Sequence, residues 1–143
     1  MASAAVYDAV RTYLTAQWSA CPIAFENEPF ERPMDENGVP LPWIAMEMMG
    51  TVYGQQSIGA RTQAENRWDE EGQLWLHVFV ASGTGSSLVR GYAKQLADLF
   101  RGTLLLSDTL EFGDASLGMG EPGDDEGAYF RVSVSVTWSR MEA

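Results

Sequence analysis

The sequence predicts an α+β fold, a mainly antiparallel sheet with two helices packed on one face. Three observations predict this class: two stretches with helical spacing of apolar residues, one long stretch with strict alternation, and shorter apolar runs between turns. A chain of 143 residues with 45% apolar content is long enough to bury its own core. We therefore expect a single domain over residues 1–143.

The two predicted helices lie at residues 4–19 and from near Ser86 to Gly102. Ser3 precedes the first as a candidate N-cap, and Pro22 follows it. Gly102 is a natural C-terminal stop for the second. The helical spacing is carried by two sets of apolar residues: Val6, Val10, Tyr13, Leu14 and Trp18, and Leu88, Val89, Tyr92, Leu96, Leu99 and Phe100.

The predicted strands begin with a short one at residues 23–26 and a buried one at 43–49. We expect 64–68 to form a returning strand, joined to a strand at 74–81 by a turn at 69–72. One or two short strands are expected after the second helix. The last strand is the clearest, because apolar and polar residues alternate over ten positions, with Phe130, Val132, Val134, Val136 and Trp138 on the apolar side.

Two other segments have a distinct composition. Residues 28–42 hold four prolines and the turn-forming run 35–38, which predicts a loop. Residues 50–61 are polar and contain several glycines.

The candidate chemical motifs are incomplete. The glycine-rich run 83–87 lacks the lysine of a phosphate loop, and Leu88 stands where a dinucleotide fingerprint needs a small residue, so a turn with a helix cap is expected. His77 and Cys21 are the only residues of their types; a Cys21–His77 nucleophile pair stays open, although a structural or interface histidine is favoured. The acidic run 121–127 is read as a surface loop rather than a calcium site. We therefore predict no enzyme, no cofactor and no metal ion.

The charge of the chain excludes another class of function. The net charge is -11, with twenty acidic residues, nine basic residues and a single lysine, Lys94. Tight binding to DNA requires clustered basic residues that displace counterions. We expect negligible affinity for duplex DNA and no membrane partner.

One face of the strand at 74–81 favours a role in assembly. Trp75, His77 and Phe79 point to the side that the helices are not expected to cover, where an open sheet is normally polar. An exposed apolar patch of this kind marks a contact with another protein. A Phe79→Asp variant is then expected to leave the monomer folded. The alternative is that the loop 28–42 folds over these residues.

The order of elements resembles the tail terminator proteins of long-tailed phages and phage-like gene transfer agents. The segments that carry the resemblance extend over nearly the whole chain: Pro42-Trp43-Ile44, Gly54–Gly59, Val78–Gly85, Leu99–Gly102 and Tyr129–Trp138. They are patterns of fold rather than of chemistry.

The resemblance implies a structural virion protein of the tail or neck, made in the bacterial cytoplasm. It implies a hexameric ring that caps the tail tube, ends tube polymerisation and offers a surface to the head-tail connector, while DNA passes through the lumen without specific binding. The expected partners are other copies of the chain, the tail-tube protein and the connector protein. The resemblance also implies that the polar residues 50–61 form an extended arm that reaches a neighbour or the tube. The expected assembly interface comprises Trp75, His77 and Phe79 on the sheet and Gln55, Gln56, Ser57, Ile58, Arg61 and Arg67 on or beside this arm.

Two alternatives stay open. The chain could be another neck or tail component, either a tube protein or a head-completion protein. It could also be a small-ligand-binding domain or an enzyme with a pocket between the sheet and the loop 28–42.

Overall fold

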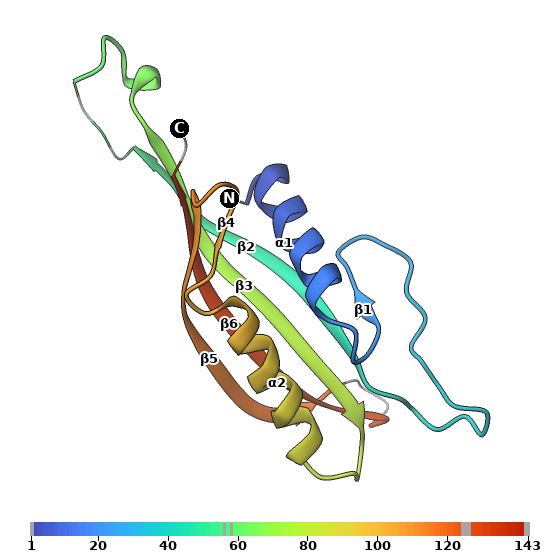
Figure 1. Ribbon diagram of the computed structural model, residues 1–143. Helices are drawn as coiled ribbons and strands as arrows, with labels where there is room; N and C mark the ends of the chain where they lie inside the picture. The colour runs from blue at the N-terminus through green and yellow to red at the C-terminus, as the bar shows by residue number, and fades with distance from the viewer. Residues whose placement is uncertain (1, 56, 58, 124–126, 142–143) are drawn as a thin grey trace.

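The computed structural model describes residues 2–55, 57, 59–123 and 127–141, and places them in one six-stranded sheet with two long helices (Figure 1). The elements in chain order are α1 (Ala4–Gln17), β1 (Ile23–Ala24), β2 (Trp43–Gln55), the 3-10 helix η1 (Gln63–Glu65), β3 (Trp68–Ala81), α2 (Ser87–Phe100), β4 (Leu104–Leu105), β5 (Leu110–Pro122) and β6 (Tyr129–Met141).

The strand order is β1-β2-β3-β6-β5-β4. The pairings from β2 to β4 are antiparallel, but β1 pairs with β2 in parallel. The α+β class is confirmed, whereas the expectation of a mainly antiparallel sheet is corrected, because the sheet is mixed. The cause is the long proline-rich connection, which carries the chain back to the starting end of β1 before β2 begins, as a parallel pair requires.

The start of α1 and the end of α2 agree with the sequence signals. The Ser3 hydroxyl accepts a hydrogen bond from the Val6 N–H at 3.5 Å. Ser3 also donates its N–H and hydroxyl to the Glu70 carboxylate, at 2.7 and 2.9 Å, which fixes the start of α1 to β3. After α2, Gly102 adopts a φ of 70°, which a glycine accepts without strain.

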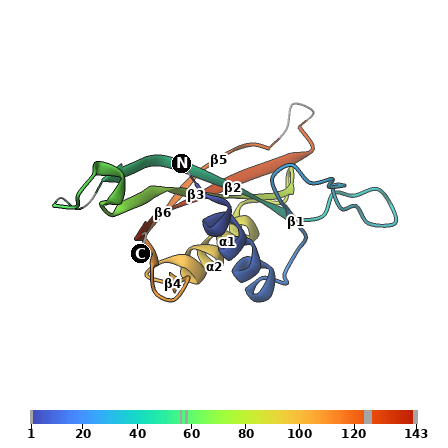
Figure 2. The same ribbon diagram turned by 90° about the horizontal axis from the view of Figure 1, so that it is seen from above.

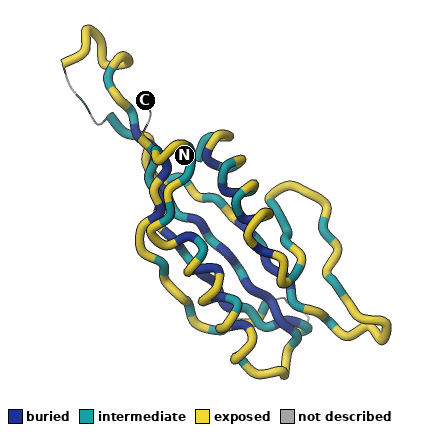
Figure 3. Tube along the Cα trace, viewed as in Figure 1, coloured by how far each residue is buried: buried dark blue, intermediate teal, exposed yellow. Residues whose placement is uncertain are grey.

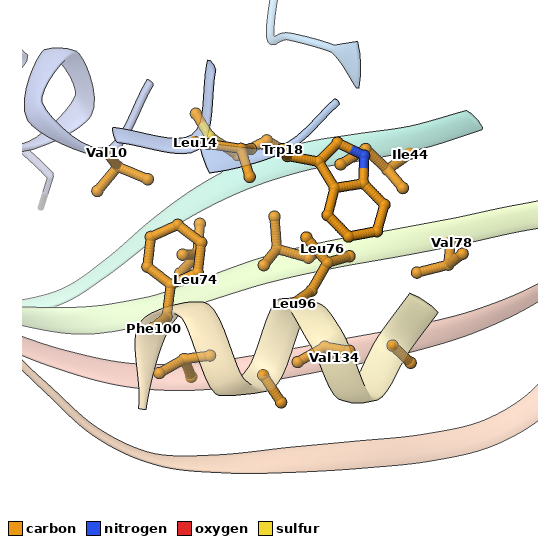
Figure 4. Close-up of a cluster of buried hydrophobic side chains, with 14 of the residues drawn as sticks. Val10, Leu14, Trp18, Ile44, Leu74, Leu76, Val78, Leu96, Phe100 and Val134 are labelled. Carbon is orange, nitrogen blue, oxygen red and sulfur yellow. The ribbon is translucent and has the colours of Figure 1, made fainter. Parts of the chain in front are cut away.

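The main core lies between the helices and one face of the sheet. Figure 2 shows α1 and α2 on the same side of the strands. Figure 4 shows apolar side chains from both helices meeting those of β2, β3 and β6. The predicted alternation of β6 is confirmed by the four apolar residues Val132, Val134, Val136 and Trp138, which are at most 3% exposed. Each such side chain contributes about 1.5–3 kcal/mol by leaving water.

The connection between β2 and β3 projects past the end of the sheet (Figure 1), because β2 and β3 pair as far as Gln55 and Trp68 while β6 pairs with β3 as far as Asp69. The turn expected at 69–72 is wrong, because these residues lie inside β3, and the returning strand expected at 64–68 is replaced by η1 and the start of β3. Gly72, the glycine of that run, allows the β2 backbone and the Trp138 side chain to approach β3 closely. A Cβ on Gly72 would lie 1.9 Å from the Met49 carbonyl oxygen and 2.8 Å from the Trp138 ring.

The strand β5 is much longer than the short strands expected after α2. It pairs with β6 from Leu110 to Pro122, with two irregularities in register. Its glycines interrupt the alternating pattern and hide the strand in the sequence. At Gly120 a side chain is excluded, because an added Cβ would lie 2.0 Å from the Phe130 ring.

The proline-rich segment between β1 and β2 is a loop, as expected. The predicted turn at 35–38 is confirmed: the Asp35 carboxylate accepts from the N–H groups of Asn37 and Val39, at 2.8 and 2.9 Å. Arg11 on α1 pairs with Glu28 at 2.9 Å and holds the start of the loop. Figure 3 shows that this loop and the β2–β3 arm are largely exposed, while burial follows the sheet and the inner sides of the helices.

Candidate assembly surface

The sheet face opposite the helices holds a shallow hollow over its middle strands. Trp75 and His77 are half-buried there, and their rings stack with centroids 6.1 Å apart and planes 11° apart. Met49 and Met119 contribute apolar side chains that are 51% and 84% exposed. The remaining lining is polar or glycine: Glu47, Gly118, Gly120, Glu121, Arg131 and Ser133. A large side chain of a partner can rest on this surface.

Polar contacts hold the His77 ring against the sheet. Its Nδ1 lies 2.6 Å from the Ser133 hydroxyl, and its Nε2 lies 3.5 Å from the Glu47 carboxylate. Beside it, Arg131 donates from Nε to Glu121 at 3.0 Å, which ties β6 to β5. These contacts orient the imidazole on the open face of the sheet.

Phe79 does not belong to the exposed surface. It is 7% exposed and stacks on Trp43, with ring centroids 4.0 Å apart and planes 6° apart. Tyr129 and Phe30 complete this second cluster, and Phe30 comes from the proline-rich loop. The expectation that Phe79 lies exposed is therefore wrong, because the loop covers this end of the sheet. The expectation that Phe79→Asp leaves the monomer folded no longer follows.

The arm is organised by a few local hydrogen bonds. Gln55 donates to the Ser57 carbonyl at 2.8 Å, and the Ser57 hydroxyl accepts from the Arg67 N–H at 2.7 Å. The Arg67 guanidinium pairs with Asp69 at 3.2 Å. Arg61 pairs with Glu65 at 2.8 Å, yet its side chain remains 85% exposed. The predicted interface residues Gln56 and Ile58 lie outside the described residues.

The structure separates the two predicted parts of the interface. Trp75 lies seven residues along β3 from the start of that strand at Trp68, where the arm joins, which corresponds to about 23 Å of extended chain. The hollow and the arm therefore lie apart along one hairpin. Met119 could not be predicted as part of this surface, because its glycine neighbours give no strand signal.

The other candidate sites do not assemble into chemistry. Cys21 packs against the main core on the helix side, whereas His77 lines the hollow on the opposite face, so the two form no pair. Burial raises the pKa of the Cys21 thiol, which weakens it as a nucleophile. Residues 83–87 form the expected turn before α2, although Ser86 makes no side-chain cap.

The part of the chain that the structure describes lacks a cluster of metal-ligating side chains. Within it, no three His, Cys, Asp or Glu residues lie close enough together to hold a metal ion. The predicted acidic surface loop is only partly described: Glu121 and Pro122 belong to β5, and residues 124–126 lie outside the described residues. None of the described helices is long and apolar enough to cross a membrane.

Exposed apolar side chains on an open sheet face, such as Met49 and Met119, are typical of surfaces that contact other proteins. The family model of the phage tail terminator protein matches residues 5–138. The chain therefore belongs to the phage tail terminator family, which confirms the resemblance seen in the sequence, and it is a structural protein of a phage tail.

Seventeen chains of solved structures are similar to this one. One of them aligns with a TM-score of 0.61 and 19% identity, covering 95% of this chain and 95% of its own. At this level of identity the likeness shows a shared fold. A search of curated proteins gave no match.

Proposed function

We propose that this protein caps the tail tube as a hexameric ring, ends tube polymerisation and presents the surface to which the head-tail connector attaches. The observation that carries the proposal is the match to the tail terminator family over residues 5–138. The partners are neighbouring copies, the tail-tube protein and the connector protein, and the protein resides in the tail or neck of the virion.

The charges of the open face support a role next to DNA. A groove near the arm end of this face is lined by Glu71 and Glu111, both exposed, together with neutral polar side chains such as Gln73 and Thr137. If this face borders the lumen of the ring, its carboxylates repel the phosphate backbone. DNA then passes without specific binding, in keeping with the net charge of -11.

The arm supports a contact beyond the body of one subunit. It carries the exposed Arg61 on a chain that is otherwise strongly acidic, and it projects from the end of the sheet (Figure 1). A basic side chain on an acidic protein fits an acidic surface on a neighbouring copy or on the tube. In this proposal the Trp75–His77 hollow forms a second contact region, which binds a side chain of the partner.

Deleting the gene and measuring tails by electron microscopy tests the capping role. Particles without the protein are expected to carry tails of irregular, excessive length that fail to join heads, and expression of the intact gene from a plasmid should restore uniform tails. Uniform tails of normal length with heads attached, in the deletion strain, would refute the capping role.

A charge reversal tests the arm. Arg61→Glu is expected to weaken ring formation by at least about tenfold, since like charges across an interface repel. Arg90→Glu on α2 is the matched control, because Arg90 is also exposed but lies outside the arm. Native mass spectrometry of the purified proteins gives the populations of ring and monomer. Equal ring formation by both variants would remove the arm from the interface between copies.

A further inference from the structure

The sheet ends on both sides in long strands that are mostly uncovered. On one side, β1 pairs only with Ile44 and Ala45 of β2. On the other, β4 pairs with Leu110 and Glu111 of β5, and the backbone of Phe112 bonds to the segment beside β4. In the described residues no further strand lies beside Met46–Gln55 of β2 or Gly113–Pro122 of β5. We call these two stretches the β2 edge and the β5 edge.

The backbone groups of the β5 edge point away from the sheet at alternate residues. The Phe112 N–H donates to the Thr103 carbonyl at 2.9 Å, so Phe112 directs its backbone groups outward, and its partner on β6 is Trp138. The next alternate residues of β6, Val136 and Val134, pair with Ala115 and Leu117 of β5. Because backbone direction alternates along an antiparallel ladder, both also direct their N–H and C=O outward.

The β2 edge has the same character. The Ile44 N–H donates outward to the Pro22 carbonyl, and the Met48 N–H is bound at 2.7 Å by the carboxylate of Glu26. Glu26 is an exposed side chain that caps this amide in the isolated chain. It can leave when a backbone carbonyl takes its place.

The two edges lack one usual protection against pairing with another strand, which is lysine. Lysine on the edge is a common device, but the single lysine, Lys94, lies on α2. Exposed apolar side chains occur on both edges: Met49, Val52 and Tyr53 on β2, and Leu117 and Met119 on β5. Irregularities in register divide each strand into short regular runs, which restricts the partners that fit.

We propose that neighbouring copies in the ring join by antiparallel pairing of the β5 edge of one copy with the β2 edge of the next. This inference rests on the proposed ring. Each edge spans ten residues, and the edges lie on opposite sides of the sheet. Since the three pairings between them are antiparallel, β2 and β5 run in opposite directions. Copies in one common orientation then pair antiparallel, and a contact between two different surfaces closes a ring when the rotation between copies is a sixth of a turn, as the proposed hexamer requires.

This pairing staggers each copy relative to its neighbour. Through the register, the middle of the β2 edge lies level with Trp138, while the middle of the β5 edge lies level with Val134. Full pairing therefore shifts each copy by about four residues, or ~13 Å along the strands. A closed array of strands tilted to its axis requires a stagger of this kind. All helices then lie on one side of the ring wall and all open faces on the other.

The first test uses tails assembled with Leu117→Pro in the deletion strain. Proline removes the outward N–H of the β5 edge and leaves the ladder to β6 intact. We expect less than about a tenth of the normal amount of this protein in purified tails, since pairing loses a central hydrogen bond. Leu117→Ala, which keeps the N–H, should be incorporated normally. Normal incorporation of Leu117→Pro with an unchanged circular dichroism spectrum would overturn edge pairing.

If Leu117→Pro does not fold, a second measurement tests the edge pairing. Hydrogen–deuterium exchange of the natural protein is compared between the free chain and purified tails. Outward amides of both edges, Gly50 and Leu117 among them, should exchange on the order of 100-fold more slowly in tails. Unchanged rates at both edges would overturn the pairing. Tail length in the deletion strain tests capping separately. If the protein caps tails but its edge amides are not protected in them, edge pairing is refuted and the capping role stands.

Discussion

Truncating Phe79 to alanine tests whether the second cluster belongs to the core of the single chain. The ring is 7% exposed, stacks on Trp43 at 4.0 Å and meets Tyr129 edge-on at 6.4 Å. Removing a buried Phe side chain costs about 3–5 kcal/mol, and the ring pairing accounts for roughly 1 kcal/mol of it. Because this cluster is small and lies at the end of the sheet, we expect the lower end, about 3 kcal/mol.

Equilibrium unfolding in urea, followed by tryptophan fluorescence and circular dichroism, measures this loss. With a slope of about 2 kcal/mol per M, typical of a domain of this size, the midpoint should fall by about 1.5 M. Leu88→Ala is the control: Leu88 is 50% exposed on α2 and should change stability by no more than about 0.5 kcal/mol. A loss of stability below about 1 kcal/mol for Phe79→Ala would refute the packing argument. Phe79 would then again be a candidate for the interface between copies.

Three further predictions concern a buried carboxylate, the thiol and DNA. Glu70→Gln should lower the free energy of unfolding by about 1–3 kcal/mol, because the buried carboxylate that accepts both Ser3 hydrogen bonds loses its charge. Glu71→Gln, at an exposed position, should cost little, and equal thermal midpoints of the two variants would contradict this prediction. Burial and the raised pKa of Cys21 predict that a thiol reagent at pH 8 labels the unfolded chain faster than the folded one, and equal rates would place the thiol in solvent. Duplex DNA should not bind at physiological salt, and salt-dependent micromolar affinity in a fluorescence titration would show otherwise.

The elements with strong local periodicity could be predicted from the sequence. The helix α1 repeats its apolar residues on one side and begins at Ser3, whose hydroxyl makes the expected cap. The strand β6 alternates without interruption, and the structure buries one side of it. In both cases one element carries the whole signal, so no knowledge of its neighbours is needed.

The β2–β3 arm and β5 could not be predicted, because distant residues determine them. Asp69 and Glu70 look like turn residues, yet the partner of Glu70 is Ser3, far away in the chain. Gly72 and Gly120 look like turn glycines, but each makes room for an aromatic ring on β6. A local pattern cannot distinguish a glycine that turns the chain from one that admits a neighbour.

The candidate surface was only partly predictable for a related reason. Alternation along β3 correctly places Trp75 and His77 on the face away from the helices. It cannot say what covers each position on that face. Phe30, from a loop with no periodic signal, packs on Trp43 beside Phe79, while Trp75 remains half-exposed further along the strand.

The strand order also has a consequence for how the chain folds. The sheet consists of two hairpins, β2–β3 and β5–β6, whose strands are close in sequence, joined through the pairing of β3 with β6. That central pairing is long-range: Trp75 opposes Ser135, 60 residues later. Because closing a long loop costs entropy before its contacts form, each hairpin should form first and the two should dock in the slow step. Substitutions along the β3–β6 seam should then slow folding more than equally destabilising substitutions in loops.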